Sequence, residues 1–231
     1  MRHDYTLLEP DAATTARPTL LDLLQLADSS FPSGSYAHSF GLEWLDRQAG
    51  FDLEAVLRVR LSENLARLEL PLVRFSYDAR EVAELLELDR LMDVLTPVHE
   101  LRQASRSIGR SFLRAAVKLR PLGLPAEVAV RGVEHQAVVF GAVLRDWSVP
   151  LTDGLAVYAL QSVRQQLSAA QRLGRIGQSA VQELQHELKP AMLAAVDRSL
   201  RVPVDEAGSF APWLDLAGMK HEQQFARLFL S

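Results

Sequence analysis

Apolar residues recur at spacings of three and four positions from about residue 19 onward, and strict alternation of apolar and polar residues is scarce. This spacing collects apolar side chains on one face of an α-helix, whereas alternation is typical of a strand. The clearest case is residues 51–70, where Asp52 is placed to cap a helix. The apolar face of that helix consists of Leu53, Val56, Leu57, Leu61, Leu65 and Leu68. The sequence therefore predicts an all-α protein, a single-domain bundle of about nine or ten helices.

Breaks in the helical pattern divide the chain into three parts. We expect residues 1–17 to form a flexible N-terminal segment, residues 18–212 a helical bundle domain, and residues 213–231 a C-terminal docking tail. The strongest internal breaker, residues 120–125, is short and has apolar helices on both sides. That favours a loop within one bundle over a domain boundary. The first helix is expected to bury a stripe made of Leu20, Leu21, Leu24, Leu26 and Ala27.

Composition excludes several classes of protein. Hydrophobic residues make up 48% of the chain and charged residues 23%, which is typical of a globular domain rather than a disordered one. The formal net charge of -4 argues against nucleic acid as the main partner. The absence of cysteine rules out thiolate catalysis and cysteine-based metal sites. The longest apolar run, residues 137–144, is far short of the ~20 residues of a membrane helix. We therefore expect a soluble cytoplasmic protein with no secretory signal and no membrane partner.

One stretch near the start, "FPSGSYAHSFGLEWL" at residues 31–45, suggests chemistry. Ser35 and His38 are three positions apart, so on a helix a hydroxyl would lie beside an imidazole, as in a helical hydrolase. The stretch lacks the second glycine and the preceding strand of a nucleophile elbow, however. The competing interpretation is a serine-capped helix that begins near Tyr36. Gly41 inside that helix would then indicate the close approach of another backbone.

Metal and phosphate sites are weakly supported. The six histidines stand singly, without the paired spacing of zinc-binding motifs, so we predict no stable metal site within the chain. A ligand set assembled from distant parts of the fold, or across a dimer axis, stays open. Residues 174–177 lack the ending of a phosphate-binding loop and follow a helix, which favours a helix C-cap and a turn.

The C-terminal stretch "MKHEQQFARLFLS" is amphipathic, with apolar residues close to the chain end. Terminal residues are usually disordered unless they dock onto something. Docking onto this protein's own bundle and docking into a partner's groove fit the pattern equally well.

Five blocks in order make the chain similar to a known family. They are "LLQLADSSFPSGSYAHSFGLE", "ELRQASRSIGRSFL", "HQAVVFGAVL", "AAQRLGRIGQSAVQEL" and "MKHEQQFARLFLS", and they lie within residues 20–231. With these blocks the chain resembles the urease accessory protein UreF family. The resemblance implies an all-helical homodimer without catalytic chemistry of its own. Such a protein binds the UreD accessory protein, also called UreH, and recruits the GTPase UreG. The complex delivers nickel to the urease apoprotein, so the resemblance implies no cofactor held stably by this chain.

The resemblance also assigns roles to residues. Its partner-binding residues, with no catalytic residue or metal ligand among them, would be Tyr36, His38, Ser39, Glu43, His221, Glu222, Arg227, Leu228, Phe229 and Ser231. A second set is interpreted as mainly structural: Arg102, Gly109, Phe140, Gly141, Arg172, Gly174, Gly177 and Gln178. For Gly41, Gly141 and Gly177 we predict tight helix packing.

Three alternatives to a pure scaffold stay open at this point. The protein would regulate GTP hydrolysis by its partner if Arg227 served as an arginine finger supplied in trans. It would be a helical hydrolase if Ser35 and His38 acted together. A helical ligand-responsive regulator is disfavoured, because the chain is acidic and has no recognisable DNA-recognition helix.

Overall fold

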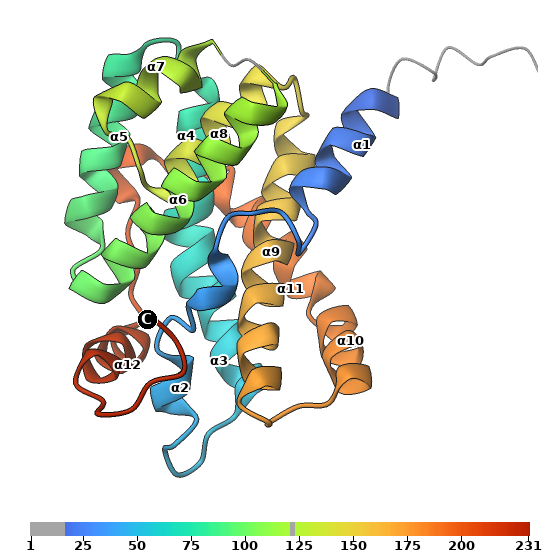
Figure 1. Cartoon of the computed structure of the whole chain (residues 1–231), viewed down its shortest axis with the longest axis vertical. Coiled ribbons are helices and arrows are strands. Elements are labelled where there is room, and N and C mark those ends of the chain that lie inside the picture. Colours follow the sequence, from blue (N-terminus) through green and yellow to red (C-terminus); the bar gives the residue numbers. More distant parts are fainter. Residues whose placement is uncertain (1–16, 121–122) are drawn as a thin grey trace, which may run out of the picture.

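The computed structural model describes residues 17–120 and 123–231, and every regular element in these ranges is helical (Figure 1). The predicted all-α fold is thus confirmed. The α-helices are α1 (Arg17–Leu26), α2 (Leu42–Leu45), α3 (Leu53–Val59), α4 (Leu70–Asp78), α5 (Val82–Leu95), α6 (His99–Leu119), α7 (Leu124–Arg131), α8 (Gln136–Asp146), α9 (Leu151–Arg172), α10 (Gln178–Glu187), α11 (Lys189–Ser199) and α12 (Pro212–Glu222). Short 3-10 helices cover Ser35–Ala37 and Val204–Glu206, and a π-helix covers Arg60–Glu69.

The core lies where α4, α6, α8 and α9 meet. The rings of Phe112, Phe140 and Tyr158, one from each of α6, α8 and α9, follow one another at centroid distances of 5.2 Å. Helix α8 lies very close to α4, because a Cβ added at Gly141 would be 2.2 Å from the carbonyl oxygen of Val73. The predicted tight packing at Gly141 is confirmed. At Gly177 it is wrong, since nothing lies within 4 Å of an added Cβ there.

The π-helix joins α3 to α4 in one continuous helical rod. In a π-helix each N–H donates to the carbonyl five residues earlier instead of four, as the N–H of Leu70 does to the carbonyl of Leu65. In an α-helix the carbonyl of Arg67 would accept from residue 71, but Pro71 has no N–H. The N–H of Gly208 supplies that donor at 3.0 Å. A loop distant in sequence is thereby fixed to the rod. The predicted cap also exists, since the Asp52 carboxylate accepts from Ala55 N–H at 3.1 Å.

The first helix differs from its prediction. Leu26 and Ala27 are buried as expected, but Leu20, Leu21 and Leu24 are exposed. Helix α1 stands at the margin of the bundle and meets it at its C-terminal end, next to α9 (Figure 1). The apolar periodicity of this segment therefore predicts a helix, but it does not show which face of the helix packs against other elements. The predicted flexible segment, residues 1–17, lies outside the described residues except for Arg17.

Helices α2 and α12 lie together at one end of the molecule, at the bottom of Figure 1. Residues 223–231 follow α12 and turn back across α2 (Figure 1). Among the helices of the described ranges, none combines the length and the apolarity needed to cross a membrane. The end of the molecule that carries α2 and α12 is where the residues singled out in the sequence come together.

Candidate functional site

Residues 34–45 form two short helical turns rather than one helix. Gly34 has φ 74° and precedes the 3-10 helix Ser35–Ala37. Phe40 has φ 52°, and Gly41, with φ 81°, directly precedes α2. The prediction of a single helix from near Tyr36 is wrong, because successive left-handed residues break the helical path. The predicted close approach at Gly41 is confirmed, since an added Cβ would lie 2.8 Å from the backbone nitrogen of Gly218 on α12.

The C-terminal segment, residues 223–231, is hydrogen-bonded along this broken turn. The N–H of Leu230 donates to the carbonyl of Ala37 at 2.8 Å. The main-chain oxygen of Ser231 accepts from Phe40 N–H at 3.0 Å and from the Ser39 hydroxyl at 2.7 Å. The Ser231 hydroxyl lies 2.8 Å from His38 Nδ1. Main chain thus pairs with main chain across nearly 200 residues of sequence.

Beneath the segment lie three buried residues, Glu43, Glu100 and His221. Together with the partly exposed Arg227 they form what we call the carboxylate–histidine cluster. His221 Nε2 is 3.1 Å from Glu43 Oε2, and its Nδ1 is 2.9 Å from Glu100 Oε2. Arg227 donates to Glu100 Oε1 at 2.7 Å. The Glu43 carboxylate also accepts two main-chain N–H groups, that of Leu228 on Oε1 at 2.9 Å and that of Phe229 on Oε2 at 3.1 Å. The cluster ties α2, α6, α12 and the C-terminal segment together.

The surroundings lower the pKa of two ionisable groups in the site, Glu43 and His38. Burial alone would raise the pKa of Glu43, but the N–H groups of Leu228 and Phe229 and the ring of His221 outweigh it and hold that pKa below its ordinary value. Burial lowers the pKa of His38 from 6.5 to about 4. His38 is therefore a neutral hydrogen-bonding group around neutral pH, and Glu43 is an anion.

An apolar contact anchors the same segment. Phe229 is buried against Leu42, Ala169 and Ala170. The Arg172 guanidinium lies over the Phe229 ring, 4.3 Å from its centroid, and also donates to the carbonyl of Tyr36. Arg172, interpreted as structural from the sequence, thus joins α9 to both halves of the site.

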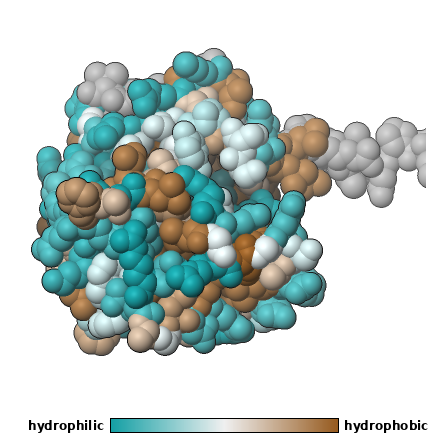
Figure 2. All heavy atoms as spheres, turned by 60° about the horizontal axis from the view of Figure 1, so that its bottom comes forward, coloured by the Kyte–Doolittle hydropathy of each residue, from teal (hydrophilic) through white to brown (hydrophobic). Residues whose placement is uncertain are grey.

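The outer side of the site is apolar. Tyr36 is 70% exposed, and Phe225, Leu228 and Leu230 are exposed beside the buried anchors. Figure 2 brings this end of the molecule forward and shows apolar groups interrupting a mostly hydrophilic surface. A segment held from below by buried groups and apolar on its outer side is a suitable surface for binding another protein.

The predicted partner-binding residues therefore divide into two groups. Those that are buried in the described chain are His38, Ser39, Glu43, His221, Phe229 and Ser231. Those that are exposed are Tyr36, Glu222, Arg227 and Leu228. Glu222 is outside the cluster and lies 3.9 Å from His99. Sequence reasoning missed Glu100, whose only signal was its place at the start of the second quoted block.

The side chains of Ser35 and His38 are not hydrogen-bonded to each other, although the His38 N–H donates to the Ser35 carbonyl at 3.2 Å. His38 Nδ1 faces the hydroxyl of Ser231 instead, and the N–H of Ser35 points to Ser33 Oγ at 3.4 Å. Arg227, considered above as an arginine finger, is occupied by Glu100. In residues 17–120 and 123–231 there is no group of three or more histidines and carboxylates arranged to hold a metal ion.

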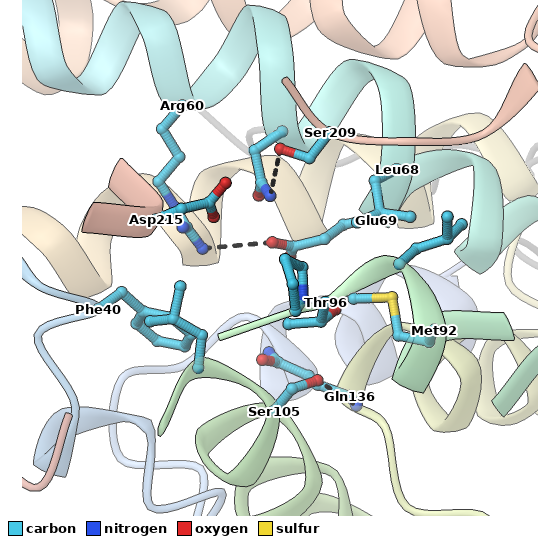
Figure 3. Close-up of a pocket in the computed structure, with 14 residues that line it drawn as sticks. Phe40, Arg60, Leu68, Glu69, Met92, Thr96, Ser105, Gln136, Ser209 and Asp215 are labelled. Carbon is cyan, nitrogen blue, oxygen red and sulfur yellow. Dashed lines mark hydrogen bonds and ion pairs between the residues drawn. The ribbon is translucent and has the colours of Figure 1, made fainter. Parts of the chain in front are cut away.

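A small cavity of about 80 Å³, lined by both polar and apolar side chains, lies next to the site (Figure 3). Phe40 closes one end of it, and the Arg60 guanidinium lies over the Phe40 ring and pairs with Glu69 at 3.4 Å. Burial raises the pKa of Asp215, another of its lining carboxyls. A cavity of this size holds a few water molecules but is much smaller than ordinary small-molecule pockets. It is therefore not the site's main feature.

Comparisons with known proteins point to a single family. A family model described as UreF matches residues 49–189. A protein from Arthrobacter sp. strain FB24 is 35% identical, with 91% of this chain and 96% of that protein covered. One from Nostoc sp. strain PCC 7120 is 30% identical, covering 96% and 100%. One from Bacillus sp. strain TB-90 is 30% identical, covering 92% and 99%. All three are named urease accessory protein UreF.

Proposed function

The chain belongs to the UreF family of urease accessory proteins, and we propose that it acts as a non-enzymatic scaffold in the maturation of urease. In this proposal the chain binds a UreD-like protein, also called UreH-like, and recruits a UreG-like GTPase. The assembly, with this chain as a homodimer in the cytoplasm, then delivers nickel to the urease apoprotein. Nickel is cargo of the whole assembly and is not a cofactor of this chain.

The observation that supports this proposal is the pairing of the C-terminal segment with residues 37–43. The pairing places the exposed Leu230 against Ala37, next in sequence to Tyr36, and the exposed Leu228 against Glu43. Tyrosine is enriched at the centre of protein–protein interfaces, and apolar neighbours help to exclude water around it. We propose that the UreD-like protein binds this surface.

A direct role in GTP hydrolysis has less support. An arginine finger has to reach a nucleotide bound by another protein, whereas Arg227 is held at 2.7 Å by Glu100. Single-turnover GTP hydrolysis by the UreG-like protein, with and without this chain, separates a holding role from a regulatory one. The scaffold proposal expects equal hydrolysis rates.

The experiment that tests the scaffold role is co-purification from cells that express the three proteins together. We expect the full chain to retain both the UreD-like and the UreG-like protein. A chain that lacks residues 223–231 should lose both, because it lacks Leu228, Phe229 and Leu230. Its far-ultraviolet circular dichroism should keep its helical shape, since the deletion begins after α12.

A matched control tests whether the loss of any exposed apolar side chain is enough to weaken co-purification. Val94 on α5 is exposed, and its replacement by serine should leave co-purification unchanged. If the truncated chain retains both partners as well as the full chain does, the proposed role of the C-terminal segment is wrong.

A further inference from the structure

His221 is the one member of the carboxylate–histidine cluster with both of its polar atoms facing acids. Its side chain has no exposed surface, so water does not substitute for either contact. A carboxylate accepts hydrogen bonds and, when ionised, donates none. A neutral imidazole has one N–H and one lone pair, so it would satisfy one carboxylate and point a lone pair at the other. With Glu43 and Glu100 both ionised, the geometry requires N–H on both nitrogens, which means an imidazolium ion.

The charges of the four cluster residues balance when His221 is protonated, and the half-exposed Arg47 outside the cluster adds one further positive charge. Glu43 and Glu100 contribute two negative charges, and His221 and Arg227 two positive ones. At the rim, Arg47 lies 3.2 Å from Glu43. A second pair at the rim, His99 and Glu222, is exposed to solvent. Buried charges are tolerated when they are paired in this way, whereas an unpaired buried carboxylate is strongly destabilising.

Glycines make this meeting of three helices possible. Gly41, just before α2, lies against Gly218 on α12, whose backbone nitrogen would be 2.8 Å from a Cβ added at Gly41. An added Cβ at Gly218 would lie 3.0 Å from the Leu101 side chain on α6. Larger residues at these positions would push the helices apart, and one imidazole would no longer span two carboxylates. The backbone packing and the ionic contacts are therefore parts of one arrangement.

We propose that His221 is a positioning residue, held as an imidazolium between Glu43 and Glu100, which aims the Glu43 carboxylate at the N–H groups of Leu228 and Phe229. Through Glu43 it orders the C-terminal segment before any partner arrives. This inference rests on the proposed function, since the segment it orders is the surface proposed for the UreD-like protein. His221 itself does not contact the partner.

The protonation state is tested first and needs no partner. Two-bond proton–nitrogen correlation spectra of the isotope-labelled full chain distinguish an imidazolium from either neutral tautomer. We expect both ring nitrogens of His221 to be protonated around neutral pH. Replacing Glu100 by glutamine offers the ring an amide donor, so Glu100→Gln should convert His221 to a neutral ring with one N–H. A neutral His221 in the unaltered chain would overturn the proposal.

The positioning role is tested by amide hydrogen exchange. In His221→Gln the two N–H donors share one nitrogen, so they cannot reproduce the two donors that the ring presents on separate nitrogens. Protection of the Leu228 and Phe229 N–H groups should therefore fall by at least about tenfold. Amides of α4 and α8 should keep their protection, which shows that the bundle is folded. His99→Gln is the matched control, because His99 is exposed and outside the cluster. Unchanged protection of both amides in His221→Gln would overturn the positioning role.

Affinity for the UreD-like protein then separates the two proposals. We expect His221→Gln to weaken binding by at least about tenfold, and His99→Gln to leave it unchanged. If His221→Gln releases the segment while binding stays the same, the positioning role stands and the proposed partner surface is wrong. If binding weakens with no change in exchange, His221 acts otherwise than by ordering the segment, and the inference is wrong while the proposed surface stands.

Discussion

Of the positions in the site, position 41 requires glycine most strictly. Its φ of 81° is unfavourable for any side chain, and a Cβ would collide with the α12 backbone. We expect Gly41→Ala to lower the free energy of unfolding by about 3 kcal/mol or more. Gly34 is the matched control, because its φ of 74° is similar but nothing lies within 4 Å of an added Cβ. Gly34→Ala should cost only about 1 kcal/mol. Urea titrations of both variants measure the difference, and equal costs would refute the packing argument.

His38 makes the attachment of the C-terminal segment sensitive to acid. Its pKa is lowered from 6.5 to about 4, so a released His38 takes up a proton at a higher pH than a buried one. Attachment is therefore undiminished above pH 6.5 and weakens as the pH falls toward 4, by up to about 3 kcal/mol. Protection of the Leu230 N–H, corrected for the intrinsic pH dependence of exchange, measures this loss. In His38→Gln this pH dependence should be much smaller, and an unchanged profile would contradict the assignment to His38.

At the scale of the helical elements, some glycines lie where two helices touch, as Gly141 does, and others, such as Gly177, do not. Gly141→Ala would place a methyl group 2.2 Å from the Val73 carbonyl and should force α4 and α8 apart, costing at least about 3 kcal/mol. At Gly177 nothing lies within 4 Å of an added Cβ, and the φ of -82° suits alanine. Gly177→Ala should therefore change the free energy of unfolding by no more than about 0.5 kcal/mol. Thermal or urea unfolding compares the two. A large loss of stability at Gly177 would contradict the packing described here.

The C-terminal segment depends on a single large anchor. Phe229→Ala removes a ring buried against α2 and α9, for which about 3 kcal/mol is the usual cost. Because the segment is short and terminal, we expect it to detach while the bundle stays folded. Limited proteolysis should then cut within residues 223–231 faster than in the unaltered chain. Phe225→Ala is the control, since Phe225 is fully exposed. Equal cleavage rates for the two variants would rule out the anchor.

Local patterns predict these elements to different degrees. The stripe in residues 51–70 is periodic, and Leu57, Leu61, Leu65 and Leu68 are indeed buried. The same reasoning fails at Leu20, Leu21 and Leu24, because a period does not say whether another element covers the face. It also misses the π-helix, whose register depends on Pro71 and on a distant donor at Gly208.

At the scale of the whole molecule, the site depends on contacts that no local pattern contains. Glu43 and His221 are 178 positions apart, and His221 and Glu100 are 121 apart. The sequence could single out the two stretches that carry most of the partner-binding candidates, through their resemblance to a family. It could not indicate that the stretches pair with each other, or that most of the candidates face inward. Tertiary packing, including the close approach at Gly41, decides both.

The central claim is that Tyr36 and the C-terminal segment form one surface for the UreD-like protein. The most direct test is the affinity of an immobilised UreD-like protein for four chains: unaltered, Tyr36→Ala, Leu228→Ala and Val94→Ala. Tyr36 and Leu228 expose their side chains beside the buried anchors, so each of these replacements should weaken binding by about tenfold or more without changing stability. Val94→Ala, on α5, should bind as the unaltered chain does. Equal affinities for all four chains would contradict the claim.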